Sequence, residues 1–202
     1  MARGTTVATR FLVVALFGLL AACGGGTEAS VEFTGEQVDP PFEVSPTPLT
    51  DTDGAPFSLT EDTDEDLTLV FFGYTNCPDI CGQVMATLAG TMTRLDEDVR
   101  DRVEVVFVTT DPARDDEAAL RTYLDRFDPS FVGLTGDLQT IIDVADPLAV
   151  AVEQGEKLPS GGYEVTHGTQ VTGINAEDRV PIVWTQGTSA SALADDIHRL
   201  LA

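Results

Sequence analysis

The sequence has few basic residues, few cysteines and few histidines, and each shortage limits the classes of function that the protein can have. Only 11 of the 202 residues are Lys or Arg, against 34 Asp and Glu, so the formal net charge is −23. A surface this acidic repels phosphate backbones, which excludes nucleic acid as a partner, and solubility is its simplest explanation. Three cysteines and two histidines leave very few positions for thiol or metal chemistry.

The first 22 residues predict a removable export signal. Two arginines precede the apolar run FLVVALFGLL, which is too short to span a bilayer comfortably, and two alanines follow it. The segment LLAAC resembles a bacterial lipobox, in which the cysteine becomes the lipidated first residue. We therefore expect Cys23 to anchor the protein on the extracytoplasmic face of the cell membrane. The alternative is an ordinary cleaved signal followed by an incidental cysteine.

Residues 23–45 predict a lipidated cysteine followed by a flexible tether. The stretch is Gly-rich, then acidic, then interrupted by Pro40 and Pro41, and it shows little apolar periodicity. Residues 46–202 are then enough for one domain.

From residue 46 onward, strand and helix patterns alternate. Two continuous apolar runs rich in β formers, 67–74 and 103–110, predict buried strands. The other predicted elements are helices over 79–95, 115–127 and 138–145, a short strand over 131–136, a hairpin over 169–185, and a closing helix over 189–201 with Ser189 as its N-cap. This order predicts an α/β domain with a central mixed sheet flanked by helices.

Cys77 and Cys81 follow the first of these buried strands, at the edge where open α/β sheets keep their sites. Pro78 suits the first position of a helix, which predicts Cys77 at or beside the N-cap, where free N–H groups favour a thiolate. The pair can be a structural disulfide, a redox couple or two metal ligands. Neighbours four apart on a helix have Cβ atoms about 5–6 Å apart, which suits two thiolates on one metal with less strain than a disulfide.

Two thiolates do not saturate a metal, so a third ligand is needed. His167 lies between a Gly-rich loop and a strand, and Gly168 leaves room for close approach, although a histidine there can equally be structural. We interpret His198, in the closing helix, as a solvated surface residue. Met85 and Met92 have ordinary helical core spacing, which favours packing over copper binding.

Three motifs together resemble the Sco/SenC family of thioredoxin-fold copper proteins. They are GYTNCPDIC, then VTTDPARD after the next strand, then YEVTHG before a hairpin. The resemblance covers roughly residues 46–202 and implies a thioredoxin-like fold that binds copper, as Cu(I) or Cu(II), through Cys77, Cys81 and His167. It also implies a metallochaperone that serves the binuclear copper centre of cytochrome c oxidase. The expected partner is the copper-bearing subunit of that oxidase or another copper-site protein, and we expect a monomer.

Asp111 and Pro112 match the Asp-Pro of the family motif. Asp111 is either a turn former after its strand, or a fourth ligand, or an acceptor that orients His167. The sequence departs from the family pattern at Asn76, where the family often has His, and at Gly82, where it often has Pro. The ligand types are retained, so these departures bear on affinity rather than on binding itself.

The donor chemistry agrees with copper. Thiolates select Cu(I) and imidazole serves both oxidation states, whereas zinc prefers a fourth ligand that no further Cys or His supplies. The alternative function is an extracytoplasmic thiol–disulfide oxidoreductase, in which Cys77 and Cys81 keep the cysteines of a copper-site partner reduced. His167 favours the chaperone, because a thiol reductase needs no third ligand. A peroxiredoxin is disfavoured, because Thr75 lies two residues before Cys77 and the usual Thr-x-x-Cys is absent.

Overall fold

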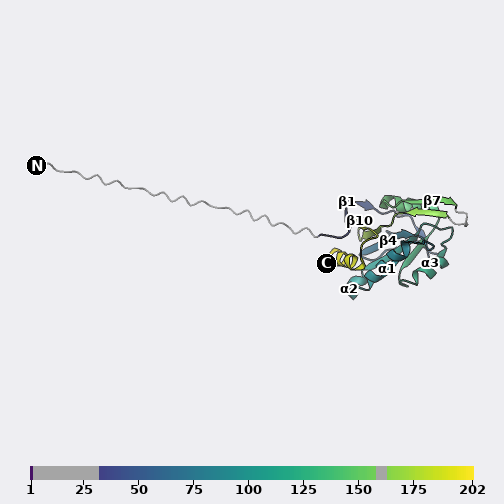
Figure 1. Cartoon of the computed structure of the whole chain (residues 1–202), viewed down its shortest axis with the longest axis horizontal. Helices are drawn as coiled ribbons and strands as arrows, with labels where there is room; N and C mark the ends of the chain where they lie inside the picture. Colours follow the sequence, from purple (N-terminus) through teal and green to yellow (C-terminus); the bar gives the residue numbers. More distant parts are fainter. Residues whose placement is uncertain (2–31, 158–162) are drawn as a thin grey trace. The chain divides into compact units, whose positions relative to one another are not determined.

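The computed structural model describes Met1, residues 32–157 and residues 163–202, without the side chains of 154–167. Phe33 to Ala202 form one compact unit, to which the description below refers. The predicted α/β class with a central mixed sheet is confirmed (Figure 1). Within the described ranges, no helix is both long enough and apolar enough to cross a membrane.

An eight-stranded sheet forms the centre of the domain, in the order β1-β10-β9-β4-β5-β6-β2-β3. The parallel pairs are β4 with β5 and β5 with β6, and the remaining pairs are antiparallel. Its strands are β1 (Glu36–Glu43), β2 (Leu49–Asp51), β3 (Pro56–Phe57), β4 (Leu67–Gly73), β5 (Val103–Thr109), β6 (Val132–Thr135), β9 (Val171–Asn175) and β10 (Arg179–Trp184). A separate antiparallel hairpin pairs β7 (Val152–Lys157) with β8 (Tyr163–His167).

Most helices lie between these strands along the chain, and the last helix follows the last strand. The helices are α1 (Cys81–Met92), α2 (Glu97–Arg100), α3 (Glu117–Leu124), α4 (Leu138–Ala145), the 3₁₀ helix η1 (Asp146–Leu148) and α5 (Ala190–Leu200). Ser189 is the N-cap of α5, as predicted, because its side chain accepts the backbone N–H of Ala192 at 3.2 Å.

Two cores cover the two faces of the sheet. On one face, Leu69 and Phe71 of β4 pack with buried residues of α1, α3 and α5, and Met85 and Met92 belong to this core. On the other face, Val70 and Phe72 pack with α4 and η1. All seven residues of β4 are buried because both faces are covered, which explains why this strand is a continuous apolar run rather than an alternating one. The predicted core role of both methionines is confirmed.

The predicted end of the tether at residue 45 is wrong. Residues 36–43 form strand β1, which pairs with β10 and makes one outer edge of the sheet. The residues before it are also held, because the carboxylate of Asp196 accepts the backbone N–H groups of Thr34 and Gly35 at 2.9–3.1 Å. Strand β1 is exposed along most of its length and carries prolines and charges, so its sequence shows no strand pattern. The domain therefore begins near Phe33.

Candidate metal centre

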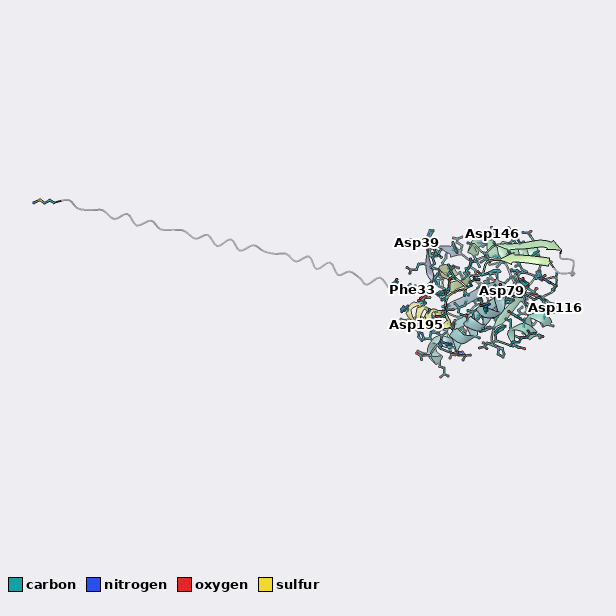
Figure 2. All side chains as sticks on the ribbon, viewed as in Figure 1. Phe33, Asp39, Asp79, Asp116, Asp146 and Asp195 are labelled. Carbon is teal, nitrogen blue, oxygen red and sulfur yellow. The ribbon has the colours of Figure 1, made fainter. Side chains whose placement is uncertain are left out.

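The two cysteines lie where β4 passes into α1. We call residues 74–80, which connect the two elements, the Cys77 loop. Helix α1 begins at Cys81 with Ile80 as its N-cap, so the predicted N-cap at Cys77 and the predicted first helical position at Pro78 are wrong. The backbone N–H of Cys77 instead donates to the carbonyl of Tyr74 at 3.2 Å, which closes a separate turn before the helix. Figure 2 labels Asp79, an exposed residue of this loop.

The sulfur of Cys77 nevertheless receives the hydrogen bonds expected at a helix start. Its Sγ accepts the backbone N–H of Cys81, the first residue of α1, at 3.4 Å. Hydrogen bonding from the N–H groups of Asp79 and Ile80 and from the Cys81 thiol also lowers the pKa of Cys77. These donors stabilise a thiolate, so the predicted electrostatic character of Cys77 holds although its position in the helix does not.

The two thiols differ in acidity. Burial alone raises the pKa of Cys77, but hydrogen bonds from the Cys81 thiol and from three backbone N–H groups outweigh it, and the net pKa is lowered. Cys81 is fully buried, and burial together with its hydrogen bond to Cys77 raises its pKa well above that of a free thiol. No disulfide joins the two in this structure. The pair therefore combines a half-buried, acidic thiol with a buried, weakly acidic one.

A glycine allows the strand to approach these thiols closely. A Cβ added at Gly73 meets the Cys81 sulfur at 3.2 Å and the ring of Phe107 at 3.0 Å, so no larger residue fits without displacement. The carbonyl of Gly73 accepts the backbone N–H of Thr110 at 2.7 Å and its hydroxyl at 3.1 Å. The start of the Cys77 loop is thereby fixed to the end of β5.

Asp111 forms the turn after β5. Its carbonyl accepts the N–H groups of Arg114 and Asp115 at 3.0 Å, as expected of an Asp-Pro turn former. Its carboxylate is only 2 % exposed and binds the Arg114 guanidinium through Oδ2, while Oδ1 has no hydrogen-bond partner among the described residues. Burial raises the pKa of this carboxyl, and Arg114 opposes the rise. The roles of Asp111 as a ligand or as an orienting acceptor stay predictions.

His167 is the last residue of β8, and its side chain lies outside the described part of the chain. Its backbone pairs with Val152, and the next N–H, of Gly168, donates to Ala151 at 3.0 Å. Strand β9 runs antiparallel to β4 and starts at Val171, opposite Phe71. The start of β9 therefore lies beside the carboxyl end of β4, where the Cys77 loop begins. The backbone at position 167 precedes β9 at this end of the sheet. Among residues with described side chains, no three His, Cys, Asp or Glu residues are grouped to hold a metal.

His198 belongs to neither the Cys77 loop nor the β7–β8 hairpin. Its Nδ1 lies 2.8 Å from the carbonyl of Ala194, and its Nε2 lies 3.6 Å from the Asp96 carboxylate. The interpretation of His198 as a solvated surface residue is therefore only partly right, because the ring is half-buried and links α5 to the segment before α2.

Sequence reasoning missed Asp115, the last residue of VTTDPARD. Its fully buried carboxylate accepts hydrogen bonds from Thr75 in the Cys77 loop and from Thr109 in β5. The available signal was the place of this acidic residue in the same motif as Asp111, six positions after the end of the buried strand β5.

The fold and the position of these residues define a thioredoxin-like domain with a cysteine pair between a strand and a helix. A family model described as SCO1/SenC matches residues 34–202, and the chain belongs to this family. It is 31% identical over 135 residues to the mitochondrial protein SCO2 homolog of Mus musculus. The matched residues make up 66% of this chain and 53% of that protein. The chain spans about half the length of the curated relatives it matches.

Solved structures support the same fold. The apo Sco1 protein of Thermus thermophilus is 26% identical, with a TM-score of 0.76 over 85% of this chain and 99% of that one. The ScoI protein of Bradyrhizobium japonicum, solved with copper bound, is 28% identical, with a TM-score of 0.70 over 78% of this chain and 99% of that one. The predicted Sco/SenC membership and thioredoxin-like fold are confirmed.

Proposed function

We propose that the protein is a copper metallochaperone that binds one copper ion through Cys77, Cys81 and His167. It then delivers that copper to the binuclear copper centre of cytochrome c oxidase. The observation that carries the proposal is topological. The cysteine pair follows the carboxyl end of β4, and the backbone of His167 precedes β9 at that same end of the sheet, although Cys81 and His167 are 86 positions apart in the sequence. The copper-bound ScoI relative supports copper as the metal.

The acidities of the two thiols suit a metal that is held and then released. Cys77, with its lowered pKa, supplies a thiolate readily, and two thiolates with one imidazole form a soft donor set for Cu(I). Cys81 must lose its proton before it can coordinate, and its raised pKa opposes that loss. Copper binding therefore releases a proton from Cys81, and acidification favours release of the metal.

The proposal extends to the location of the protein. Cleavage after residue 22 and lipidation of Cys23 would anchor the domain on the extracytoplasmic face of the membrane. The partner there is the copper-bearing subunit of the oxidase or another copper-site protein, met by a monomer. Because the domain begins near Phe33, a tether of only about ten residues, 23–32, would join it to the lipid.

Removing the His167 imidazole should sharply weaken copper retention. The full chain, with Cys23→Ser so that two thiols remain, is reduced, loaded anaerobically with Cu(I), desalted, and assayed for copper per chain. We expect one copper in this background and much less in His167→Ala, because two thiolates alone leave the ion open to exchange.

The matched control is His198→Ala, which removes the other histidine of the chain and should leave copper retention unchanged. Retention that is indifferent to His167, or that depends equally on His198, contradicts the three-ligand site.

A second candidate function follows from the acidity difference between the thiols. The Cys77 thiolate can attack a disulfide sulfur of a partner protein, which forms a mixed disulfide and releases one partner thiolate. Cys81, after losing its proton, then attacks the Cys77 sulfur. The Cys77–Cys81 disulfide forms, the second partner thiol leaves, and the partner is reduced by two electrons. This sequence would keep the cysteines of a copper site reduced.

Cys81→Ser should trap the first step of this exchange. Incubated with oxidised glutathione in the Cys23→Ser background, it should accumulate one glutathione on Cys77, measured by intact-protein mass spectrometry. The chain that keeps both cysteines should pass through this adduct to the internal disulfide. Cys77→Ser is the control, because the buried Cys81 should form little adduct. Comparable adducts in both serine variants contradict the assigned order of attack.

A further inference from the structure

Asp115 connects the Cys77 loop to the sheet. Its side chain is fully buried. Along the chain, Asp115 lies between the turn after β5 and the first residue of α3. Oδ2 accepts the backbone N–H of Thr75 at 2.8 Å, and Oδ1 accepts the Thr75 hydroxyl at 2.5 Å. Thr75 lies two residues before Cys77, so both bonds hold the segment that carries the reactive sulfur.

The same residue also contacts the ends of the next two strands. Oδ2 accepts the hydroxyl of Thr109, the last residue of β5, at 2.8 Å. Its backbone carbonyl accepts the hydroxyl of Thr135, the last residue of β6, at 3.0 Å. One aspartate therefore joins the loop after β4 to the carboxyl ends of β5 and β6. A buried carboxylate with several donors is strongly ordered, because charge-assisted hydrogen bonds are about twice as strong as neutral ones.

The Cys77 loop is thus fixed at two nearby points. Gly73, directly before the loop, is held by Thr110, and Thr75, within the turn that ends at Cys77, is held by Asp115, so little freedom remains in the chain leading to Cys77. Copper ligation requires the sulfurs of Cys77 and Cys81 to stay apart as two separate thiolates. A disulfide instead requires the two Cβ atoms to approach to about 3.8 Å. The anchored loop is observed with both thiols reduced.

We propose that Asp115 is a positioning residue that holds the Cys77 loop in the dithiol arrangement used for copper binding. It acts through Thr75 and is not itself a ligand. The copper part of this inference rests on the proposed function, whereas the thiol–disulfide part does not. The inference has two consequences: loss of Asp115 should weaken Cu(I) binding, and it should shift the thiol–disulfide equilibrium toward the disulfide.

The test compares Asp115→Ala and Asp115→Asn in the full chain with Cys23→Ser. In glutathione buffers, two protein thiols and one oxidised glutathione exchange with one protein disulfide and two reduced glutathiones. We expect Asp115→Ala to shift this equilibrium at least about fivefold toward the protein disulfide, since each lost hydrogen bond of about 1 kcal/mol is worth that factor. In competition with the Cu(I) chelator bicinchoninate, its Cu(I) affinity should fall about tenfold.

Asp115→Asn should restore both values to within about twofold. Its amide oxygen can replace Oδ2 as acceptor for Thr75 N–H and the Thr109 hydroxyl, and its NH₂ can donate to the Thr75 hydroxyl. If Asp115→Ala does not fold, Thr75→Val supplies the test. It removes the hydroxyl bond to Asp115 and an exposed bond that the hydroxyl accepts from the Asn76 amide, but keeps the backbone N–H bond, so it should shift the equilibrium in the same direction by a smaller factor.

Asp196→Ala is the control for general destabilisation. It removes another fully buried carboxylate that accepts several hydrogen bonds, but in α5, away from the Cys77 loop. It should change neither the glutathione equilibrium nor the copper affinity. Values unchanged in Asp115→Ala and Thr75→Val, or moved equally by Asp196→Ala, overturn the inference. If the unsubstituted site binds no Cu(I), the proposed function fails, and the glutathione equilibrium alone still decides the role of Asp115.

Discussion

Iodoacetamide should alkylate Cys77 at least about 100-fold faster than Cys81 near neutral pH, because each unit between two thiol pKa values changes the relative thiolate population about tenfold. The pKa of Cys77 is lowered and that of Cys81 is raised, and the fully buried Cys81 is also shielded from the reagent. Thiolate is lost as pH falls through the pKa of its thiol. The Cys77 rate should therefore persist below the pH at which an ordinary thiol, with a pKa of about 8.5, loses reactivity.

The measurement is the rate of carbamidomethylation of each cysteine as a function of pH, read from the two cysteine-containing peptides by mass spectrometry. The Cys23→Ser background removes the third thiol, and reduced glutathione in the same tube reports an unperturbed thiol. Cys77 should have its half-maximal rate at a lower pH than glutathione. Equal rates for the two cysteines, or a Cys77 profile displaced to higher pH, would show that the hydrogen bonds to Cys77 Sγ do not control its reactivity.

Asp196→Ala should lower the free energy of unfolding by about 3 kcal/mol, the range expected when a buried charged acceptor is removed and its donors remain unpaired. The Asp196 carboxylate accepts N–H groups from Thr34, Gly35 and the Trp184 indole at 2.9–3.1 Å, and it binds Arg199 at 3.0 Å. These bonds attach the segment before β1 to α5 and β10. Urea unfolding followed by Trp184 fluorescence measures the loss.

Asp195→Ala is the matched control, since it removes the neighbouring carboxylate of the same helix from an exposed position. Figure 2 labels Asp195 and, at the same end of the folded domain, Phe33. Its substitution should change the unfolding free energy by less than about 0.5 kcal/mol, as is usual for surface positions. An equally large loss in both variants would attribute the effect to the helix rather than to the buried hydrogen bonds.

The strands and helices with strong apolar patterns were predictable from the sequence. The predicted strand over 67–74 corresponds to β4, the helix over 138–145 to α4, and the hairpin over 169–185 to β9 and β10. Their patterns reflect burial on one or both faces, so local sequence carries the information. The cysteine pair was placed correctly at the strand–helix junction for the same reason, because it follows the most buried strand of the sheet.

Features that depend on distant contacts were not predictable. Strand β1 is exposed and carries two prolines, and it is a strand only because β10 lies beside it. Helix α1 begins at Cys81 rather than beside Cys77, and the chain before it is held at Gly73 by Thr110 and at Thr75 by Asp115, residues more than 30 positions away. Nothing in the local pattern around Pro78 reports those bonds. The ligand role of His167 stays a prediction, since only its backbone is described.

The two outer strands also determine how the sheet meets other chains. Strand β1 contains Pro40 and Pro41, which lack N–H groups, and its pairing with β10 is irregular between Gln37 and Phe42. The opposite edge is β3, which has only two residues and begins with Pro56. Neither edge offers an unbroken row of hydrogen-bond donors to an incoming strand, so both resist edge-to-edge aggregation. The protein can in this way keep an open sheet without polymerising through its outer strands.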